Sequence, residues 1–202
     1  MKIYDLLIIG GGPAGLSCAL VLGSAKNKPF VAAKNIAIIA HQRNADLGAA
    51  LLNNVLGIKP GTYGATVLKD GQEQLATTYP HIEQIAKEKV IAISGEKGNF
   101  IVTTNKGTYQ AKELVIAVKT ANFDIEGLME YVVPHQGFIA EKNKIQLKNT
   151  NHLVTDGIYV AGVLAGWRSQ LPIAMGSGAQ VATDILTDWN NGIQTIAHDV
   201  IK

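Results

Sequence analysis

Hydrophobic residues near the start of the chain follow first one periodicity and then another. Residues 3–9 form a continuous apolar run rich in Ile and Leu, which is typical of a strand covered on both faces. Small and apolar residues then recur at helical spacing, and they are Gly15, Cys18, Ala19 and Leu22. A loop over 27–35 and a second buried strand over 36–40 follow. This pattern predicts a strand, a turn, a helix packed closely on the strand, and a second strand.

The middle of the chain is less regular. Residues 41–64 are rich in Asn, Gly and turn signals, with one short apolar piece at 49–52. A mixed pattern over 66–89 predicts a helix that Pro80 interrupts. Four strands are expected, over 90–94, 100–104, 108–111 and 113–118. An Asn-Lys-Gly turn separates the second from the third, which indicates a hairpin.

The last third of the chain predicts a strand over 157–161, a loop over 162–171 and a helix from Pro172. One stripe of that helix carries Gly178, Val181, Ile185 and Trp189, and its Asp184 and Asp188 are expected to face water. Strands that alternate with helices, together with a hairpin, predict an α/β fold around a mainly parallel sheet.

Composition narrows the class of protein. A length of 202 residues suits one generous domain, and 47% hydrophobic with 17% charged residues excludes disorder. A net charge of +2 argues against a nucleic-acid groove or an anionic-membrane patch. The single cysteine, Cys18, excludes an internal disulfide and an intrachain redox dithiol.

The apolar start of the chain could belong to a signal peptide or a membrane helix, and the residues around it argue against both. Lys2 is the only basic residue before the apolar run, and Asp5 follows closely, whereas a signal peptide has a basic n-region. Three glycines and Pro13 interrupt the run, whereas a membrane helix needs about 20 uninterrupted apolar residues. We therefore expect no membrane association and a cytoplasmic location.

Residues 10–15 fit the pattern G-x-G-x-x-G between a predicted strand and a predicted helix. In this pattern Gly10 permits a tight turn, Gly12 lets the backbone approach a pyrophosphate, and Gly15 allows close packing of helix on strand. The helix N-terminus presents free N–H groups and the positive end of its dipole to the phosphates. The context predicts nucleotide binding.

The acidic residue that often follows the second strand and binds the ribose is missing. His41 or Gln42 could bond a ribose hydroxyl instead, and Arg43 could meet a 2′-phosphate. The alternative is that these residues form only a solvated strand end.

Four segments resemble the FAD-binding part of thioredoxin reductase-like proteins, within the FAD-dependent pyridine nucleotide-disulfide oxidoreductases. Residues 4–15 look like the opening motif, and 54–57 (Asn-Val-Leu-Gly) like an Asn-aromatic-Pro-Gly turn beside the cofactor. Residues 113–119 are similar to the strand that ends in Ala-Thr-Gly, and 155–174 to the last FAD motif with its following helix. The resemblance implies a Rossmann-like, three-layer FAD-binding domain with a mainly parallel sheet and a β-hairpin or meander.

We expect the family's NAD(P)H domain to be absent from this sequence. Only residues 123–136 separate the first half of the resemblance from its second half, whereas a βαβ unit takes roughly 30 residues or more. We therefore expect one domain over 1–202. The family's redox Cys-x-x-Cys lies in the missing domain and Cys18 cannot replace it, so a dithiol disulfide reductase is excluded.

The resemblance implies FAD as cofactor, with contacts carried over position by position. The glycine turn would hold the pyrophosphate, His41 and Gln42 would lie near a ribose, and the Val90 backbone would meet the adenine. Asn54 would lie near the flavin, and Gly162 and Val163 would lie near the phosphates. Gln170 and Leu171 would lie at the pyrimidine edge of the flavin ring. The full set is Gly10, Gly12, Pro13, Ala14, Gly15, His41, Gln42, Asn54, Val90, Ala117, Gly162, Val163, Gln170 and Leu171.

Two further positions depart from the family pattern. Ala117-Val118-Lys119 replaces Ala-Thr-Gly, which puts a long cation where a glycine normally lets the chain turn. Val163 replaces the Asp of Gly-Asp, which removes a carboxylate that would bond the ribityl chain. The loss of one such bond costs about 1–3 kcal/mol.

The sequence shows no pattern for a metal site, a serine nucleophile or a reactive cysteine. The five histidines, at 41, 81, 135, 152 and 198, show no metal-ligand spacing. Ser17 and Ser169 lack a nucleophile-elbow context, and Cys18 sits on the helix stripe expected to be buried.

Three hypotheses follow. The first is a single-domain FAD-dependent oxidoreductase or electron-transfer flavoprotein, reduced by an external donor and serving a small-molecule or protein redox partner. The second is a non-catalytic protein that binds or senses a nucleotide, and the third is an NADP-binding module that uses Arg43. A homodimer through the C-terminal helix is compatible with each of them, since the family's members are commonly dimers.

Overall fold

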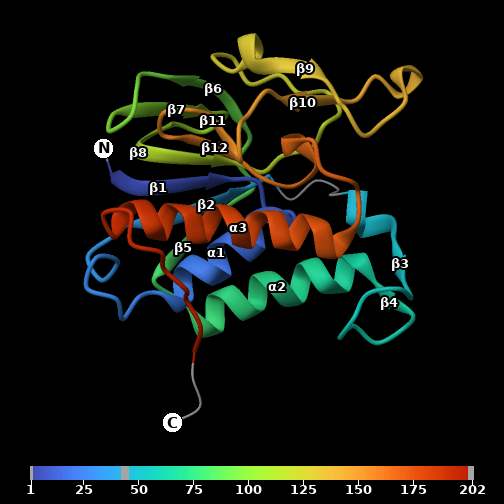
Figure 1. Ribbon diagram of the computed structural model, residues 1–202, viewed down its shortest axis with the longest axis horizontal. Coiled ribbons are helices and arrows are strands. Elements are labelled where there is room, and N and C mark those ends of the chain that lie inside the picture. Colours follow the sequence, from blue (N-terminus) through green and yellow to red (C-terminus); the bar gives the residue numbers. More distant parts are fainter. Residues whose placement is uncertain (1, 42–45, 200–202) are drawn as a thin grey trace.

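The computed structural model describes residues 2–41 and 46–199. A central sheet separates two layers, and Figure 1 shows three helices on one face and further strands on the other. The helices are α1 (Pro13–Ser24), α2 (Gly64–Thr78) and α3 (Leu171–Trp189). The described strands are β1 (Ile3–Ile9), β2 (Ile36–Ala40), β3 (Leu51–Leu52), β4 (Thr62–Tyr63), β5 (Ile82–Ala86), β6 (Val90–Ser94), β7 (Phe100–Thr104), β8 (Thr108–Ile116), β9 (Val132–Pro134), β10 (Ile145–Leu147), β11 (Leu153–Thr155) and β12 (Ile158–Val160).

The central sheet is mainly parallel. Its order is β11-β12-β8-β1-β2-β5, and every pair from β12 to β5 is parallel. Strands β6 and β7 continue from β8 as an antiparallel meander, while β9 with β10 and β3 with β4 form separate two-stranded ribbons. The expected α/β fold with a parallel sheet and a meander is confirmed.

Two apolar clusters, one on each face of the sheet, form the core. Alternate residues of β1 explain the division, because Leu6 and Ile8 pack under the helices while Leu7 and Ile9 pack under the meander. Side chains of a strand point alternately to its two faces, so a continuous apolar run is buried on both sides.

Helices α1 and α3 pack against each other at unusually short range. A Cβ atom added at Gly178 of α3 would lie 1.9 Å from the carbonyl oxygen of Ala14, so only glycine fits there. The predicted stripe of α1 is fully buried, including Cys18. This contact brings the N-terminal half of α3 against the first turn of α1, next to the glycine-rich turn.

Several sequence predictions need correction. The helix predicted over 66–89 ends at Thr78, and Ile82–Ala86 forms strand β5, because its backbone pairs with β2 at the sheet edge. The strands predicted over 108–111 and 113–118 are one strand, β8, which pairs with β7 at its start and with β1 along its length. The loop predicted over 162–171 begins with the 3₁₀ helix η4 (Gly162–Ala165). The short strands β3, β4, β9, β10 and β11, of two or three residues each, were not predicted.

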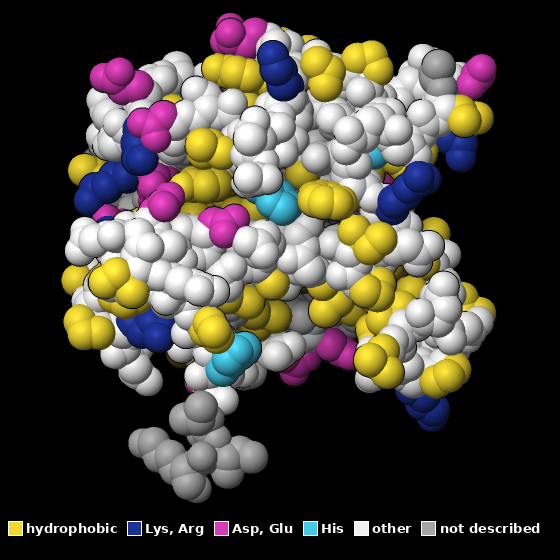
Figure 2. Space-filling view, viewed as in Figure 1, with side chains coloured by type: hydrophobic (Ala, Val, Ile, Leu, Met, Phe, Trp, Pro, Cys, Tyr) yellow, Lys and Arg dark blue, Asp and Glu magenta, His cyan; other side chains and the backbone are white. Residues whose placement is uncertain are grey.

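Charges of both signs are spread over the surface. On the face drawn in Figure 2, Lys, Arg, Asp and Glu side chains are dispersed around the edges, while hydrophobic side chains gather over α2 and α3.

Two aspartates of α3 were expected to face water. Asp184 is half-buried, whereas Asp188 is exposed and accepts a hydrogen bond from the hydroxyl group of Tyr159. None of the helices in the described part of the chain has the length and hydrophobicity that a membrane crossing requires.

Candidate functional site

A cavity of about 730 Å³ lies at the carboxyl ends of the parallel strands. Main chain from the ends of β1, β2 and β8 forms its floor, and α2 forms one wall. The lining residues are 9–12, 39–41, 48, 65, 68, 69, 72, 88–90, 117–119 and 121–125. Open parallel sheets bind their ligands at this edge, because the loops that follow the strands diverge there and leave a crevice.

The glycines of the turn after β1 have different physical tasks. Gly10 has φ +122°, and a Cβ atom there would lie 2.3 Å from the carbonyl oxygen of Ala117. A Cβ atom at Gly15 would lie 1.9 Å from the carbonyl oxygen of Gly10. At Gly12, by contrast, a Cβ atom would meet no heavy atom within 4 Å. Gly10 and Gly15 are therefore required by the fold, whereas Gly12 has open space beside it and lines the cavity.

The N-terminus of α1 provides an electropositive group in the cavity wall. Gly12 is the N-cap, no side chain caps the helix, and its first turn holds no acidic residue. The first N–H groups of a helix have no intrahelical acceptor and carry the positive end of the dipole. Pro13 follows at the first position, where its missing N–H costs nothing. This arrangement suits a phosphate group.

One end of the cavity is apolar. Ile39, Val90, Phe123 and Ile125 line it, and Phe123 is half-buried. Val90 was expected at an adenine, while the sequence assigned no role to Phe123 or Ile125. Phe123 and Ile125 follow β8, in the stretch interpreted from the sequence only as the junction left by a missing domain. Two large apolar residues at positions 123 and 125 were the signal that could have pointed to an apolar surface there.

Lysines contribute most of the charge around the cavity. Lys69, Lys89 and Lys119 line it together with Glu88 and Asp124. Lys89 pairs with Asp124, and the Nζ atom of Lys119 lies 3.8 Å from Oδ1 of Asp46. Exposed pairs of this kind stabilise the fold little, so the lysines remain available to an anionic ligand.

The residues expected at the flavin do not line this cavity, although Gly162 lies close to the first turn of α1, next to the cavity. Gly162 has φ +76°, and a Cβ atom there would lie 2.9 Å from the Cβ atom of Ala14, in the first turn of α1. Gln170 is the N-cap of α3 and Leu171 its first residue. Asn54 is exposed in the loop between β3 and β4, and Gln42 and Arg43 lie outside the described residues.

Two buried histidines hold η4 in place. Nε2 of His135 lies 2.8 Å from the carbonyl oxygen of Val163, and its Nδ1 accepts from the N–H of Gly137 at 2.9 Å. Ser177 on α3 accepts from the N–H of Gly162 at 2.8 Å and lies 3.0 Å from Nε2 of His152.

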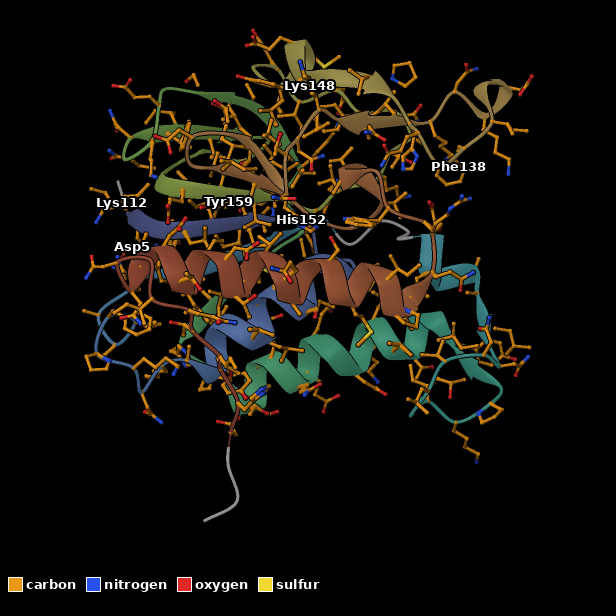
Figure 3. All side chains as sticks on the ribbon, viewed as in Figure 1. Asp5, Lys112, Phe138, Lys148, His152 and Tyr159 are labelled. Carbon is orange, nitrogen blue, oxygen red and sulfur yellow. The ribbon has the colours of Figure 1, made fainter. Side chains whose placement is uncertain are left out.

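Figure 3 shows His152 between α3 and the strands of the opposite layer. The indole N–H of Trp167 donates to Nε2 of His152 at 2.9 Å, and burial lowers the pKa of this imidazole. The sequence pointed to no role for either buried histidine. Among the described residues no cluster of His, Cys, Asp and Glu has the arrangement of a metal site.

Comparisons with known proteins agree with this geometry. The family model described as pyridine nucleotide-disulphide oxidoreductase matches residues 4–178. A ferredoxin--NADP reductase of Levilactobacillus brevis is 32% identical over 122 residues, which cover 60% of this chain and 36% of the relative. Ferredoxin--NADP reductase 1 of Bacillus cytotoxicus is 26% identical over 207 residues, which cover 98% of this chain and 50% of the relative. The chain thus spans between about a third and a half of these relatives.

Solved structures share the fold. A thioredoxin reductase from Gloeobacter violaceus superposes with a TM-score of 0.69 at 14% identity, covering 99% of this chain and 98% of that one. A ferredoxin-flavin thioredoxin reductase from Clostridium acetobutylicum has a TM-score of 0.67 at 17% identity, covering 95% and 99% of the two chains. At these identities the likeness establishes the architecture alone, which is the expected Rossmann-like one.

Proposed function

Because the chain belongs to the pyridine nucleotide-disulphide oxidoreductase family, we propose that it binds FAD and acts as an oxidoreductase or electron-transfer flavoprotein. The observation that supports this most directly is the open main chain at Gly12, between a cavity and the first turn of α1. When bound, FAD supplies an isoalloxazine ring that accepts and donates electrons.

The residues around the cavity fit the adenosine diphosphate half of FAD. Gly12 and the first turn of α1 would hold the diphosphate, with Lys119 adding positive charge where the family has a glycine. The apolar end at Val90 and Phe123 would take the adenine. These contacts would offset part of the FAD affinity that is lost because Val163 has no carboxylate to bond the ribityl chain.

The N-terminus of α3 would serve the flavin half. Gln170 caps this helix without a side-chain bond, and its first turn has no acidic residue, so its N–H groups and dipole favour negative charge on a nearby ring edge. His135 and Ser177 hold η4 from opposite sides and so fix the backbone of Gly162 and Val163. Preorganised dipoles of this kind stabilise charge without rearrangement.

Electrons have to come from outside this chain in our proposal. Cys18 is the only cysteine, it is fully buried, and burial raises the pKa of its thiol, so it forms no redox dithiol. The relatives are named ferredoxin--NADP reductases, which supports a protein redox partner or a nicotinamide nucleotide as donor or acceptor. The external donor and the single-domain form over 1–202 belong to the proposal.

Pairing of two copies through α3 is compatible with the proposal. Ile173 and Met175 expose 37% and 40% of their surface on this helix and would contribute apolar area to such an interface. Sedimentation equilibrium of the holoprotein distinguishes a monomer from a dimer.

A non-catalytic nucleotide-binding protein is the second candidate function. It is favoured by the cavity lining, which covers the turn and the apolar end but not Asn54, Val163 or Gln170. An NADP-binding module is the remaining alternative and depends on Arg43.

The visible spectrum of the purified protein separates these candidates. We expect flavin absorbance, or its appearance after incubation with FAD and desalting, and steady reduction of a dye when an external reductant is supplied. A colourless protein that retains no FAD would rule out the flavoprotein. A bound flavin that never turns over with any donor and acceptor would favour the second candidate, and tighter binding of NADP than of FAD would favour the third.

A further inference from the structure

The carboxylate of Glu88 lies at the cavity and has no role in the proposed function so far. Glu88 is 9% exposed, lies two residues before Val90, and lines the cavity beside it. A carboxylate with so little exposure is unusual, because its charge loses hydration unless partners replace the water. Its surroundings therefore indicate what it binds.

One oxygen of Glu88 is satisfied by the protein. Oε2 accepts from the hydroxyl groups of Thr104 and Tyr109, each at 2.9 Å. Burial and the bond to Glu88 raise the pKa of Tyr109 to about 12, so its hydroxyl stays protonated and remains a donor. The two bonds hold the carboxylate in one orientation.

The other oxygen, Oε1, receives no hydrogen bond from the described residues. Within the part of the chain that the structure describes, only Nε2 of His81 is both enclosed and without a hydrogen-bond partner. Oε1 is therefore not sealed in the protein and keeps access to the cavity. An ionised carboxylate oxygen accepts hydrogen bonds only, so it calls for a ligand group that donates.

The sheet register places the residues just before Glu88 beside the end of β2. Strands β2 and β5 are parallel, with Ala40 opposite Ala86, and the N–H of Lys87 donates to the carbonyl oxygen of Ala40 at 2.7 Å. The chain after β5 thus runs next to His41. His41 stands at the position where dinucleotide sites place an acidic residue on a ribose. The carboxylate that is missing after β2 is present in the loop that follows the neighbouring strand β5, at Glu88.

We propose that Glu88 accepts a hydrogen bond from the 2′-hydroxyl of the adenosine ribose and thereby selects ligands with a free 2′-hydroxyl against those with a 2′-phosphate. This inference rests on the proposed function only in placing the adenosine half of the ligand in the cavity. A 2′-phosphate would bring a second negative charge to a nearly buried carboxylate, and like charges at short range repel strongly where water is scarce.

The first test uses the unmodified protein and two ligands that differ only in the 2′-phosphate, ADP-ribose and 2′-phospho-ADP-ribose. We expect ADP-ribose to bind at least about tenfold more tightly in calorimetric titrations, the difference that one charge-assisted hydrogen bond typically makes. Equal affinities, or tighter binding of the phosphorylated ligand, would overturn the proposal without any variant.

The second test replaces the carboxylate. Glu88→Gln should weaken ADP-ribose binding about tenfold and abolish the preference over 2′-phospho-ADP-ribose. Glu83→Gln is the matched control, because Glu83 also accepts from a tyrosine hydroxyl, that of Tyr4 at 2.9 Å, but does not line the cavity. It should leave both affinities unchanged.

A purely structural role for Glu88 predicts a different result. Tyr109→Phe removes one of its two donors and keeps the charge, so we expect lower thermal stability with the preference for ADP-ribose retained. If Glu88→Gln also lowers stability and leaves the preference intact, the carboxylate is structural and the proposal fails.

Two ligand analogues test the ribose assignment. 2′-Deoxy-ADP should bind about tenfold more weakly than ADP, and Glu88→Gln should remove that difference. Inosine diphosphate lacks the exocyclic amine of adenine but keeps the 2′-hydroxyl, so Glu88→Gln should weaken its binding about tenfold, as it does for ADP. If Glu88→Gln instead weakens 2′-deoxy-ADP binding and leaves inosine diphosphate binding unchanged, the carboxylate binds the base and the ribose assignment is overturned.

Titration with FAD separates this proposal from the flavoprotein proposal. Binding of ADP-ribose that depends on Glu88, in a protein that retains no FAD, would support the role of Glu88 and refute the flavoprotein. FAD binding that is unchanged in Glu88→Gln would support the flavoprotein and refute the role of Glu88. No binding of any of these ligands would refute both.

Discussion

At the scale of single residues, one glycine motif divides into positions for the fold and a position for the ligand. Gly10 and Gly15 have backbone atoms of Ala117 and Gly10 within 2.3 Å of where a Cβ atom would stand, so any side chain disrupts the packing. Gly12 faces open space. Glycine therefore has two different roles within one turn: it permits close backbone packing at Gly10 and Gly15, and it leaves open space at Gly12.

Gly12→Val tests this division. The added side chain occupies the space left for the diphosphate, so we expect FAD affinity to fall about a hundredfold or more while the fold persists. Fluorescence titration with FAD measures the first effect and thermal unfolding the second. Gly107→Val is the control, because Gly107 also has no heavy atom within 4 Å of an added Cβ and lies in the β7–β8 turn. Wild-type affinity in Gly12→Val would remove the diphosphate from this turn.

At the scale of elements, the position of η4 and the α1–α3 contact decide how the two halves of the chain meet. Helix α3 begins after the last motif and packs on α1 through Gly178, next to Ala14. The 3₁₀ helix η4 is held by Ser177 of α3 on one side and by His135 on the other. Helix α1 and the segment of η4 and α3 come from opposite ends of the sequence, and their contact places η4 beside the first turn of α1.

Gly178→Ala should destabilise the protein by about 2–3 kcal/mol, because the new methyl group would lie 1.9 Å from the carbonyl oxygen of Ala14. Gly176→Ala, on the same helix but with no heavy atom within 4 Å, should instead stabilise it by about 0.5–1 kcal/mol through helix propensity. Urea unfolding monitored by circular dichroism measures both. Equal effects of the two substitutions would show that the helices do not approach as closely as the structure indicates.

The buried His152 should make stability depend on pH. Burial lowers its pKa in the folded state, so below about pH 6.5 the unfolded chain binds a proton that the folded chain does not. The stabilisation is complete above that pH and is lost as the pH falls towards the lowered folded-state pKa.

His152→Gln keeps an acceptor for Trp167 but does not titrate, so its free energy of unfolding should fall less steeply below pH 6.5. His81, whose pKa burial also lowers, maintains part of the slope in both proteins. His198→Gln, at an exposed position, is the control and should behave as the wild type. A variant slope equal to that of the wild type would show that His152 titrates normally.

At the scale of the whole molecule, the cavity of about 730 Å³ collects residues from the ends of β1, β2, β6 and β8, from α2 and from the loop after β8 around the adenosine diphosphate half of the proposed ligand. Most of the affinity should therefore come from that half. This distribution can be measured without any substitution.

ADP and riboflavin should stabilise the protein unequally. At a hundred times its dissociation constant a ligand adds about 2.7 kcal/mol to the free energy of unfolding, and because each 1 kcal/mol raises Tm by about 2–4 °C for a chain of this size, Tm should rise by roughly 5–11 °C. We expect such an increase with FAD and a smaller one with ADP, both at millimolar concentration, and none with riboflavin. An equal increase with riboflavin would place the main binding energy at the flavin half instead.

The sequence by itself predicted the elements whose signals are local. The apolar run 3–9, the glycine turn and the small-residue stripe through Cys18 required only neighbouring residues, and the structure has each of them as expected. Strand β5 was mistaken for helix because its exposed edge alternates weakly, and its pairing partner β2 lies some forty residues earlier. The glycine pattern, the end of the second strand and the family resemblance together supplied the ligand hypothesis and five positions that line the cavity: Gly10, Gly12, His41, Val90 and Ala117.

Only the tertiary structure decided which distant residues share the site. Phe123, Val90, Glu88 and His41 line one cavity because segments far apart in the sequence meet at one edge of the sheet. The distinction between Gly12 and its neighbouring glycines depends on the atoms of Ala117 and of Gly10 around them. Local patterns record how each segment buries its own apolar face, whereas contacts between strand ends arise only when the backbone hydrogen bonds of the sheet set their register.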